Sequence, residues 1–433
     1  MSWMDTYRNR VVTAEAAVSH ITSGQRVFMT GNCSVPQVVV GALVRRAPEL
    51  TNIELVQVLT FGKAAYAAPE LAGHIRINTL FISDTQRAAI HEGRGDFTPC
   101  FLSEIPGLFK NGNLPIDVAL IHVSPPDEHG FCSFGVEVSV TKTAAQSAKY
   151  VIAEVNPKMP RTLGDSFIHV SKLDHIVEVD YDLPEVNMAA TSELSVKIAS
   201  NVAALIPDGA TLQTGIGAIP DAVLKQLTDR KHLGVHTELF SDGIIDLVEK
   251  GVMDGERKSL HPGKIIAGFM IGSKRLYEFV NDNAIIEMHP TEYVNDPFIV
   301  AQNDLMVAIN SAIEVDLTGQ VCADSIGPRI YSGVGGQVDM IYGASRSKGG
   351  LPIIALPSTA TVKGQNLSKI VAMLKLGAGV VTTRNHVHYV VTEYGVAYLY
   401  GKTIRQRARA LIDVAAPEFR AELEQKAIEL KYL

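Results

Sequence analysis

Three short segments of the sequence place residues of chemical interest beside turns. HTELFSDG (236–243) follows a short apolar stretch, precedes a helix-like run and carries Glu238. TGIGAIP (214–220) joins a strand-like run to a helix-like run, and YSGVGGQVDM (331–340) has three glycines in four residues. A carboxylate can act as a nucleophile or a base. A single glutamate near a turn is, however, more often a cap or a solvated side chain, so spacing alone assigns Glu238 no role.

The two glycine clusters indicate backbone that passes close to another group. Glycines at a strand-to-helix turn let a ligand approach, and they leave N–H groups at the helix start free to bind an anion or an oxyanion. Pro220 suits the first turn of the following helix. It also stands where a dinucleotide-binding fingerprint would have its third glycine, which disfavours a dehydrogenase. A tight turn or a bulge remains an alternative explanation for each cluster.

Other common catalytic patterns are missing from the sequence. It contains no HExxH zinc motif, no GxxxxGK[ST] phosphate loop and no GxSxG nucleophile elbow. His386 and His388 are the closest pair of histidines and have no third ligand nearby in sequence, so we expect no metal site. The four cysteines form no CxxC pair and no disulfide framework, as is typical of a reducing compartment.

The composition is that of a globular protein. The 433 residues are 46% hydrophobic and 20% charged, and 39 Lys+Arg against 46 Asp+Glu give a net charge of 39 − 46 = −7. This acidic balance argues against nucleic-acid binding. No run reaches the roughly 18 apolar residues of a membrane helix, and the first 21 residues lack a signal-type apolar core. We therefore expect a cytoplasmic protein without a membrane partner.

The elements that must position these residues follow an α/β pattern. Short apolar runs bounded by Gly, Pro and Asn alternate with helix-like stretches, which is typical of buried parallel strands between helices. The expected strands are 26–31, 53–60, 117–124, 150–156, 211–217, 264–272, 305–311, 351–357 and 388–395. The expected helices include 37–46, 219–228 and 402–412.

An internal repeat divides the chain. The strand, loop and helix of residues 20–43 resemble those of residues 205–227, with Thr30, Gly31, Pro36 and Leu43 recurring as Thr214, Gly215, Pro220 and Leu227. Chance similarity of two such units is the alternative. We expect two related α/β domains, 1–186 and 187–433, with the polar stretch DYDLPEVN (180–187) as a linker and Glu238 in the second domain.

Taken together, these segments resemble the class I coenzyme A-transferases, in the acetyl-CoA hydrolase/transferase branch that includes 4-hydroxybutyrate and butyrate–acetate CoA-transferases. The resemblance covers nearly the whole chain, and it implies two related open α/β domains with mostly parallel sheets and a homodimer. It implies CoA and acyl-CoA as substrates and no permanently bound cofactor. Six segments carry it in order: SPPDEHGFCSFG (124–135), EVNPKMPRTLGD (154–165), TGIGAIPDAV (214–223), HTELFSDG (236–243), SGVGGQVDM (332–340) and VTEYGVAYLYGKTIRQRA (391–408).

The resemblance also implies roles for single residues. It makes Glu238 the catalytic glutamate and puts the amides near Ile216 and Gly336 in an oxyanion hole. The implied CoA-binding residues are Gly215, Ile216, Gly217, Ala218, Ile219, Gly335, Gly336 and Lys363. The implied acid-substrate pocket contains Gly31, Asn32, Ser34, Gln213 and Asn295.

The implied activity is transfer of CoA between a short acyl-CoA, such as acetyl-CoA or butyryl-CoA, and a short carboxylic acid. We expect 4-hydroxybutyrate with acetate as partner, in a ping-pong mechanism through an acyl-glutamyl anhydride and a glutamyl-CoA thioester. An acyl-CoA hydrolase that uses the same glutamate is one alternative. A non-catalytic CoA-binding protein is another.

Overall fold

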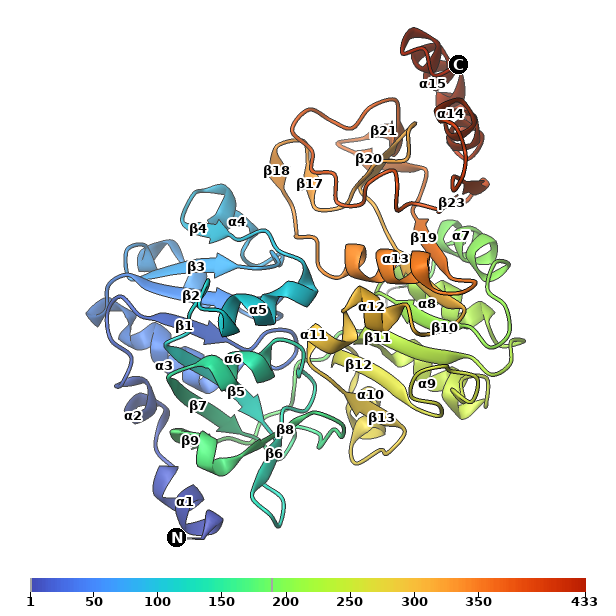
Figure 1. Ribbon diagram of the computed structural model, residues 1–433. Helices are drawn as coiled ribbons and strands as arrows, with labels where there is room; N and C mark the ends of the chain where they lie inside the picture. The colour runs from blue at the N-terminus through green and yellow to red at the C-terminus, as the bar shows by residue number, and fades with distance from the viewer. Residues whose placement is uncertain (1, 188–189) are drawn as a thin grey trace. The chain divides into compact units, whose positions relative to one another are not determined.

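The computed structural model describes residues 2–187 and 190–433, and the chain divides into two compact units (Figure 1). One unit is Met1–Asn187 with Ile266–Val294, and the other is Met188–Ile265 with Asn295–Leu433. Helices and strands alternate along the chain, and both large sheets are mostly parallel, so the expected α/β class is confirmed. The domain boundary after residue 186 stays a prediction, and the compact units differ from it in the segment 266–294.

The first large sheet is entirely parallel, with the strand order β4-β3-β2-β1-β5-β7-β9. Its interior strand β5 reads VALIHV, and all six residues are buried, as expected for a strand covered on both faces. Its strands are β1 (Arg26–Met29), β2 (Ile53–Gln57), β3 (Ile75–Thr79), β4 (Gly95–Phe97), β5 (Val118–Val123), β7 (Tyr150–Val155) and β9 (His175–Glu178).

Short helices also contribute buried residues to this unit, with the exception of α1. α2 packs on α3, and α5 packs on α6. Val18, Leu43 and Leu55 belong to one buried apolar cluster that joins helices to strands. The helices are α1 (Trp3–Arg10), α2 (Ala14–Val18), α3 (Gln37–Arg46), α4 (Arg87–His91), α5 (Ile105–Lys110) and α6 (Thr141–Ser147).

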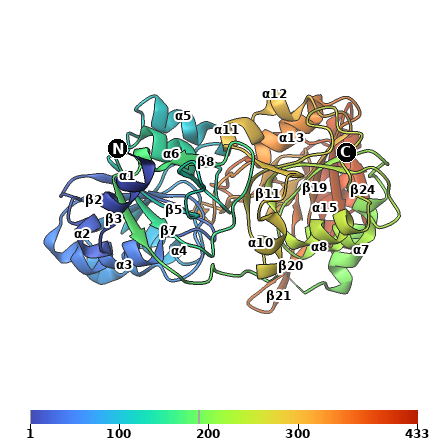
Figure 2. The ribbon, with the colours of Figure 1, turned by 90° about the horizontal axis from the view of Figure 1, so that it is seen from below.

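The second large sheet has the order β13-β12-β11-β10-β14-β19-β23-β24. The last strand pairs antiparallel to β23, and β11, β10, β14, β19 and β23 pair in parallel. α7 and α8 lie side by side (Figures 1 and 2). The strands are β10 (Thr211–Thr214), β11 (Gly234–Phe240), β12 (Ile265–Met270), β13 (Ile286–Met288), β14 (Met306–Asn310), β19 (Leu351–Ala355), β23 (Tyr389–Thr392) and β24 (Gly395–Tyr398).

Numbered along the chain within each sheet, the first seven strands of both sheets follow one spatial order, 4-3-2-1-5-6-7. The two copies of the sequence repeat thus fall on β1 and β10, which hold the same position in their sheets. The remaining helices are α7 (Glu193–Ala203), α8 (Ala218–Gln226), α9 (Asp242–Glu249), α10 (Lys274–Val280), α11 (Thr291–Val294), α12 (Pro297–Val300), α13 (Gln337–Arg346), α14 (Ile404–Asp413) and α15 (Pro417–Glu429). No helix among the described residues is both long and apolar enough to cross a membrane.

Segment 266–294 is joined to the rest of the first unit by backbone hydrogen bonds. Val138 N donates to Gly268 O at 3.2 Å, and Thr291 N donates to Ser139 O at 2.9 Å. An ion pair adds to these bonds, because Lys110 Nζ lies 2.7 Å from a carboxylate oxygen of Glu292. The first unit is therefore built from two stretches that are distant in sequence.

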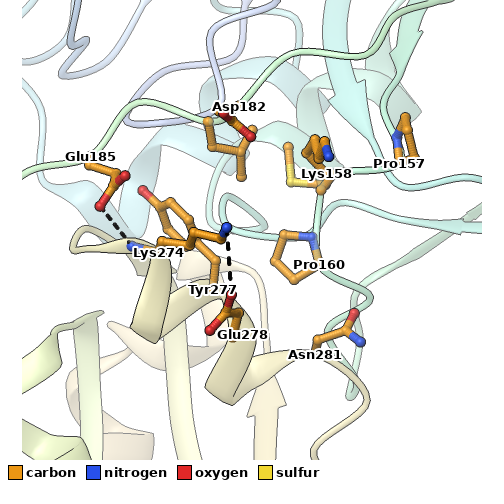
Figure 3. A pocket seen from close by; sticks show the side chains of 11 residues that line it. Pro157, Lys158, Pro160, Asp182, Glu185, Lys274, Tyr277, Glu278 and Asn281 are labelled. Atoms are coloured by element: carbon orange, nitrogen blue, oxygen red, sulfur yellow. Dashed lines mark hydrogen bonds and ion pairs between the residues drawn. The ribbon is translucent and has the colours of Figure 1, made fainter.

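The predicted linker packs on the same segment. The Tyr277 hydroxyl donates to Pro184 O at 2.6 Å. Lys274 N donates to Glu185 Oε2 at 3.0 Å, as Figure 3 shows. A cavity of about 380 Å³ lies beside these contacts, and the Nζ of Lys274 faces Glu278 at 3.9 Å on its wall (Figure 3). The stretch 181–186 is thus bound along the first unit.

A buried carboxyl joins three parts of the first unit. Glu154 on β7 is fully buried, its Oε1 accepts from Val39 N of α3 at 2.6 Å, and its Oε2 accepts from the Tyr181 hydroxyl. Burial raises the pKa of Glu154 to about 7, against an unperturbed pKa of 4.5. The folded protein therefore keeps this proton over a pH range in which the unfolded chain has lost it.

This pKa predicts how Glu154→Gln changes the pH dependence of stability. The pKa of Glu154 is higher in the folded protein than in the unfolded chain. The contribution of its proton to the stability of the fold is therefore complete below pH 4.5 and is lost as pH rises to about 7. The free energy of unfolding of the wild type, relative to the variant, should fall by up to about 1.4 kcal/mol per pH unit in this window. Urea unfolding at several pH values measures this difference. The exposed Glu104→Gln serves as control, and a difference that does not vary with pH would contradict the assignment.

Candidate active site

Glu238 lies near the carboxyl end of β11, next to the central strand β10 of the second sheet. Ligands of parallel α/β sheets bind outside this end of the strands. The neighbours Thr237 and Leu239 are buried, whereas Glu238 is only partly buried. Thr237 Oγ1 donates to Thr214 O at 3.2 Å, which ties the end of β11 to the end of β10. Strand β11 thus holds the Glu238 carboxylate at the carboxyl end of the sheet.

Asn295 holds the Glu238 carboxylate. Its Nδ2 donates to Glu238 Oε2 at 2.8 Å, and Asn295 itself is fully buried. Asn295 directly precedes Asp296, the N-cap of α12, whose side chain accepts from Phe298 N at 2.8 Å. Burial raises the pKa of Glu238 above its usual range, and the hydrogen bond from Asn295 acts in the opposite direction. A carboxylate with few water contacts is a stronger base and nucleophile than one in water.

Gly336 completes this contact. It is the N-cap of α13, and a methyl group on its Cα would overlap Glu238 Oε2 and Asn295 Nδ2 and lie 2.9 Å from Glu238 Cδ. α13 is itself fixed close to α12, because a side chain at Gly343 would overlap Val300. The structure thus brings Glu238, Asn295 and Gly336 together, and only glycine fits at position 336.

The predicted glycine loop joins β10 to α8. Gly217 is the N-cap of α8 with φ +117°, a backbone conformation that favours glycine, and the Ile216 side chain is 43% exposed. Ala218 and Ile219 form the first turn of the helix, and a Cβ at Gly215 would meet nothing within 4 Å. Both glycine clusters therefore lead into helix starts, where backbone N–H groups lack partners within the helix.

Two further predicted residues lie elsewhere in the second unit. Gln213 is buried in β10, where its Oε1 accepts from Asn310 Nδ2 at 3.0 Å, so it joins β10 to β14. Lys363 is exposed at the turn between β20 (Thr359–Val362) and β21 (Gln365–Ser368). Their roles in acid and CoA binding stay predictions.

The remaining predicted pocket residues, Gly31, Asn32 and Ser34, follow β1 in the first unit. The Asn32 amide donates to Glu137, a buried residue that sequence reasoning missed. The available signal was a single glutamate in the otherwise apolar and small run FGVEVSV (134–140). Burial raises the pKa of Glu137 to about 7.

One group among the described residues has the side-chain types of a metal site. The ligand atoms of His232, Asp254 and Glu256 lie within 4.8 Å of one another, with His232 Nδ1 2.8 Å from Asp254 Oδ2. Glu256 is exposed, and exposed acidic groups of this kind are common without an ion. Sequence spacing could not have found this group, since its members come from two separate turns.

The crowding at Gly336 predicts the effect of Gly336→Ala. The added methyl must displace the Glu238 carboxylate or the start of α13, and overpacking of this kind costs about 1–3 kcal/mol. Denaturant unfolding should show this loss, and a crystal structure should show the Asn295–Glu238 hydrogen bond broken. Gly107→Ala in α5 is the matched control, because its Cβ would have only one neighbour, at 3.8 Å. Equal stability of the two variants would contradict the crowding.

Comparison with known proteins identifies the family. The model of the acetyl-CoA hydrolase/transferase N-terminal domain matches residues 1–185, and that of the C-terminal domain matches residues 272–427. The chain is 52% identical over 98% of both chains to a 4-hydroxybutyrate coenzyme A transferase of Clostridium kluyveri. It is 48% identical to a succinyl-CoA:acetate/propanoyl-CoA:succinate CoA transferase of Fasciola hepatica, over 94% of this chain and 86% of the other.

A solved structure agrees with these matches. The crystal structure of a 4-hydroxybutyrate CoA-transferase from Porphyromonas gingivalis superposes with a TM-score of 0.86 at 43% identity, over 99% of this chain and 100% of the other. The sequence and structure matches extend over nearly the full length, and the family models cover residues 1–185 and 272–427. The chain belongs to the acetyl-CoA hydrolase/transferase family, and it is an enzyme of the CoA-transferase class.

Proposed function

We propose that this enzyme moves CoA between a short acyl-CoA and a short carboxylic acid through a covalent intermediate on Glu238. One observation carries the proposal. The Glu238 carboxylate sits at a strand end, partly buried, hydrogen-bonded to Asn295 and against the glycine start of α13. These contacts orient the carboxylate for attack. Because residue 336 is glycine, it puts no side chain between the carboxylate and the start of α13.

In the first half of the reaction, a Glu238 carboxylate oxygen attacks the carbonyl carbon of the acyl-CoA thioester. The carbon–sulfur bond breaks, CoA leaves as its thiolate, and an acyl-glutamyl anhydride forms. The thiolate then attacks the Glu238 carbonyl carbon. The bond between this carbon and the bridging oxygen of the anhydride breaks, which releases the first acid as its carboxylate and leaves a glutamyl-CoA thioester.

In the second half, the carboxylate of the acceptor acid attacks this thioester, and the same steps run in reverse. The acceptor leaves as its CoA ester, and Glu238 is again a free carboxylate, so the cycle needs no other reactant. Each step passes through a tetrahedral oxyanion. We assign its stabilisation to the backbone N–H groups of Ile216 and Gly336, which is supported by their position at or just before helix starts.

The CoA side is proposed to run along the two glycine segments, Gly215–Ile219 and Gly335–Gly336, with Lys363 near a phosphate. Glycine allows the pantetheine arm to approach the backbone closely. Binding energy from this long, unreactive arm can then be used to hold the thioester against Glu238. In this proposal the reacting group of the enzyme is a side chain of the protein itself, and CoA is a substrate.

For the acid, we propose 4-hydroxybutyrate with acetate as the exchange partner. The relatives named above act on 4-hydroxybutyrate in one case and on acetate, propanoyl and succinyl groups in another, so short acids are common to both. Hydrolysis is the alternative outcome at the same glutamate, with water in place of the acceptor acid. The family model covers both activities by its description.

Transfer and hydrolysis are separated by product analysis. With butyryl-CoA and acetate, we expect acetyl-CoA to form in step with butyrate, and Glu238→Ala to lose this activity at least about a thousandfold, as when other covalent nucleophiles are removed. Chromatography of the CoA species measures both. Free CoA formed at the same rate with or without acetate would indicate a hydrolase. An active Glu238→Ala variant with transfer intact would remove Glu238 from the mechanism.

The covalent intermediate can be trapped without an acceptor acid. Borohydride reduces a glutamyl thioester to a primary alcohol, so enzyme treated with butyryl-CoA and then borohydride should lose about 14 Da and its activity. Peptide mass spectrometry should place this loss on Glu238. The Glu238→Ala variant is the control and should keep its mass. A loss mapped to another carboxylate would reassign the nucleophile.

A further inference from the structure

Gln337 follows Gly336 directly in the chain and is the first residue of α13. The proposed chemistry gives its side chain no role, yet Gln337 is 7% exposed and its side-chain amide is paired at both ends. Gln337 Nε2 donates to Ser311 O at 2.6 Å, and Gln337 Oε1 accepts from Thr382 Oγ1 at 3.0 Å. Gln337 thus joins the start of α13 to two other segments of the second unit.

Both of these segments are themselves held by the backbone of the second unit. Ser311 follows Asn310, the last residue of β14, and β14 lies between β10 and β19 in the sheet. Thr382 is fully buried, and its backbone O accepts from Val321 N at 3.0 Å. The amide of Gln337 therefore fixes the helix start to an interior strand and to the β-bridge at Thr382.

The N-terminus of α13 lacks the usual side-chain cap. Its N-cap is Gly336, and among the described residues no side chain caps this helix. Helices are commonly anchored here by a Ser, Thr, Asp or Asn side chain that accepts from one of the first N–H groups. Such a side chain has no room at position 336, because Glu238 Oε2 and Asn295 Nδ2 occupy the space. An anchor one residue later holds the helix start and leaves the first N–H groups uncapped.

The position of this first turn is important because Gly336 lies directly against the Glu238 carboxylate. The contact of α13 with α12, at Gly343 and Val300, lies 343 − 336 = 7 residues further along, about two turns from the helix start. That contact fixes the body of the helix, whereas Gln337 fixes its first turn. A displacement of about 1 Å at a reacting group can cost about a hundredfold in rate.

We propose that Gln337 holds the N–H group of Gly336 where it stabilises the tetrahedral oxyanion formed at Glu238. Its side-chain amide anchors α13 as a capping side chain would, and it does not occupy the space in front of the carboxylate. Gln337 is a positioning residue, because its side chain hydrogen-bonds to Ser311 and Thr382 and acts on the reaction through Gly336. The inference rests on the proposed function, in which Gly336 is an oxyanion donor.

The test compares kcat and KM of Gln337→Met with those of the wild type in the exchange of butyryl-CoA with acetate. Methionine has a similar volume and makes neither hydrogen bond, so the space stays filled while the helix start loses its anchor. kcat should fall about ten- to a hundredfold, since the oxyanion donor is misplaced. KM for butyryl-CoA should stay within about twofold, because an oxyanion donor acts in the transition state rather than on the bound substrate. A purely structural role would lower the melting temperature without this separation of kcat from KM.

Thr382→Val is a milder second variant. It removes the hydrogen bond to Gln337 Oε1 with little change in side-chain shape, and kcat should fall about fivefold, as for one net hydrogen bond. Combining it with Gln337→Met should lower kcat no further than Gln337→Met alone, because the partner of the hydroxyl is already absent. Two losses that multiply would mean that the hydroxyl acts independently of Gln337, and the inference would be wrong.

Gln226→Met is the matched control. In α8 of the same unit, Gln226 Nε2 donates to Val196 O at 3.0 Å and its Oε1 accepts from Ser200 Oγ at 2.9 Å, so it makes the same two kinds of bond. Its kcat and KM should match those of the wild type within about twofold.

Three outcomes separate the inference from the proposed function. An unchanged kcat in Gln337→Met, or a loss confined to KM, would overturn the inference while transfer itself remained. If thermal melting shows that Gln337→Met does not fold, Thr382→Val decides, and an unchanged kcat in that variant overturns the inference. A wild-type enzyme that forms no acetyl-CoA from butyryl-CoA and acetate would overturn the proposed function instead.

Discussion

The candidate site in the second unit depends on direct contact between the Glu238 carboxylate and the N-terminus of α13. Glu238 comes from β11, Asn295 from the turn before α12 and Gly336 from the N-cap of α13, so three separate segments must meet at one point. Sheet pairing fixes the first, the N-cap at Asp296 fixes the second, and close packing of α13 on α12 at Gly343 fixes the third. The arrangement leaves no room for a side chain at position 336.

This crowding agrees with the chemistry proposed for it. Burial makes the carboxylate more basic, the Asn295 amide keeps it ionisable and oriented, and the open helix start offers N–H groups where negative charge would develop. None of these effects suffices alone. A buried glutamate without a donor would hold its proton, and a donor without burial would leave the carboxylate weakly nucleophilic.

Much of the fold could be predicted from the sequence, because buried parallel strands are continuous apolar runs. Each of the nine expected strand segments contains a strand, and 37–46, 219–228 and 402–412 correspond to α3, α8 and α14. β3, β4, β9, β11, β13 and β24 of the two large sheets escaped prediction, since they are short or interrupted by polar residues such as Arg76, Asp96 and Glu238. The shared strand order of the two sheets could be foreseen only through the few residues that recur in the repeat.

The site was less predictable than the fold. Glycine clusters signal close backbone approach, and the structure has both clusters at helix starts, but the clusters do not name the partner. That Gly336 meets Glu238 and Asn295 depends on contacts between residues 41 to 98 positions apart, as 336 − 295 = 41 and 336 − 238 = 98. Glu137 was missed for a related reason. A single acid in an apolar run has no periodic signature, and its partner, the Asn32 amide, lies 105 positions away in the sequence.

The division of the first unit into two stretches has a consequence for its synthesis. Its sheet is complete once β9 ends at Glu178, yet the backbone partners supplied by Gly268 and Thr291 come about a hundred residues later. At about 5–20 residues per second, a ribosome needs roughly 5 to 20 s to make that stretch. During this interval the nascent chain exposes the surface around Val138 and Ser139, which the finished unit covers. A chaperone could bind this surface while the chain is still being synthesised.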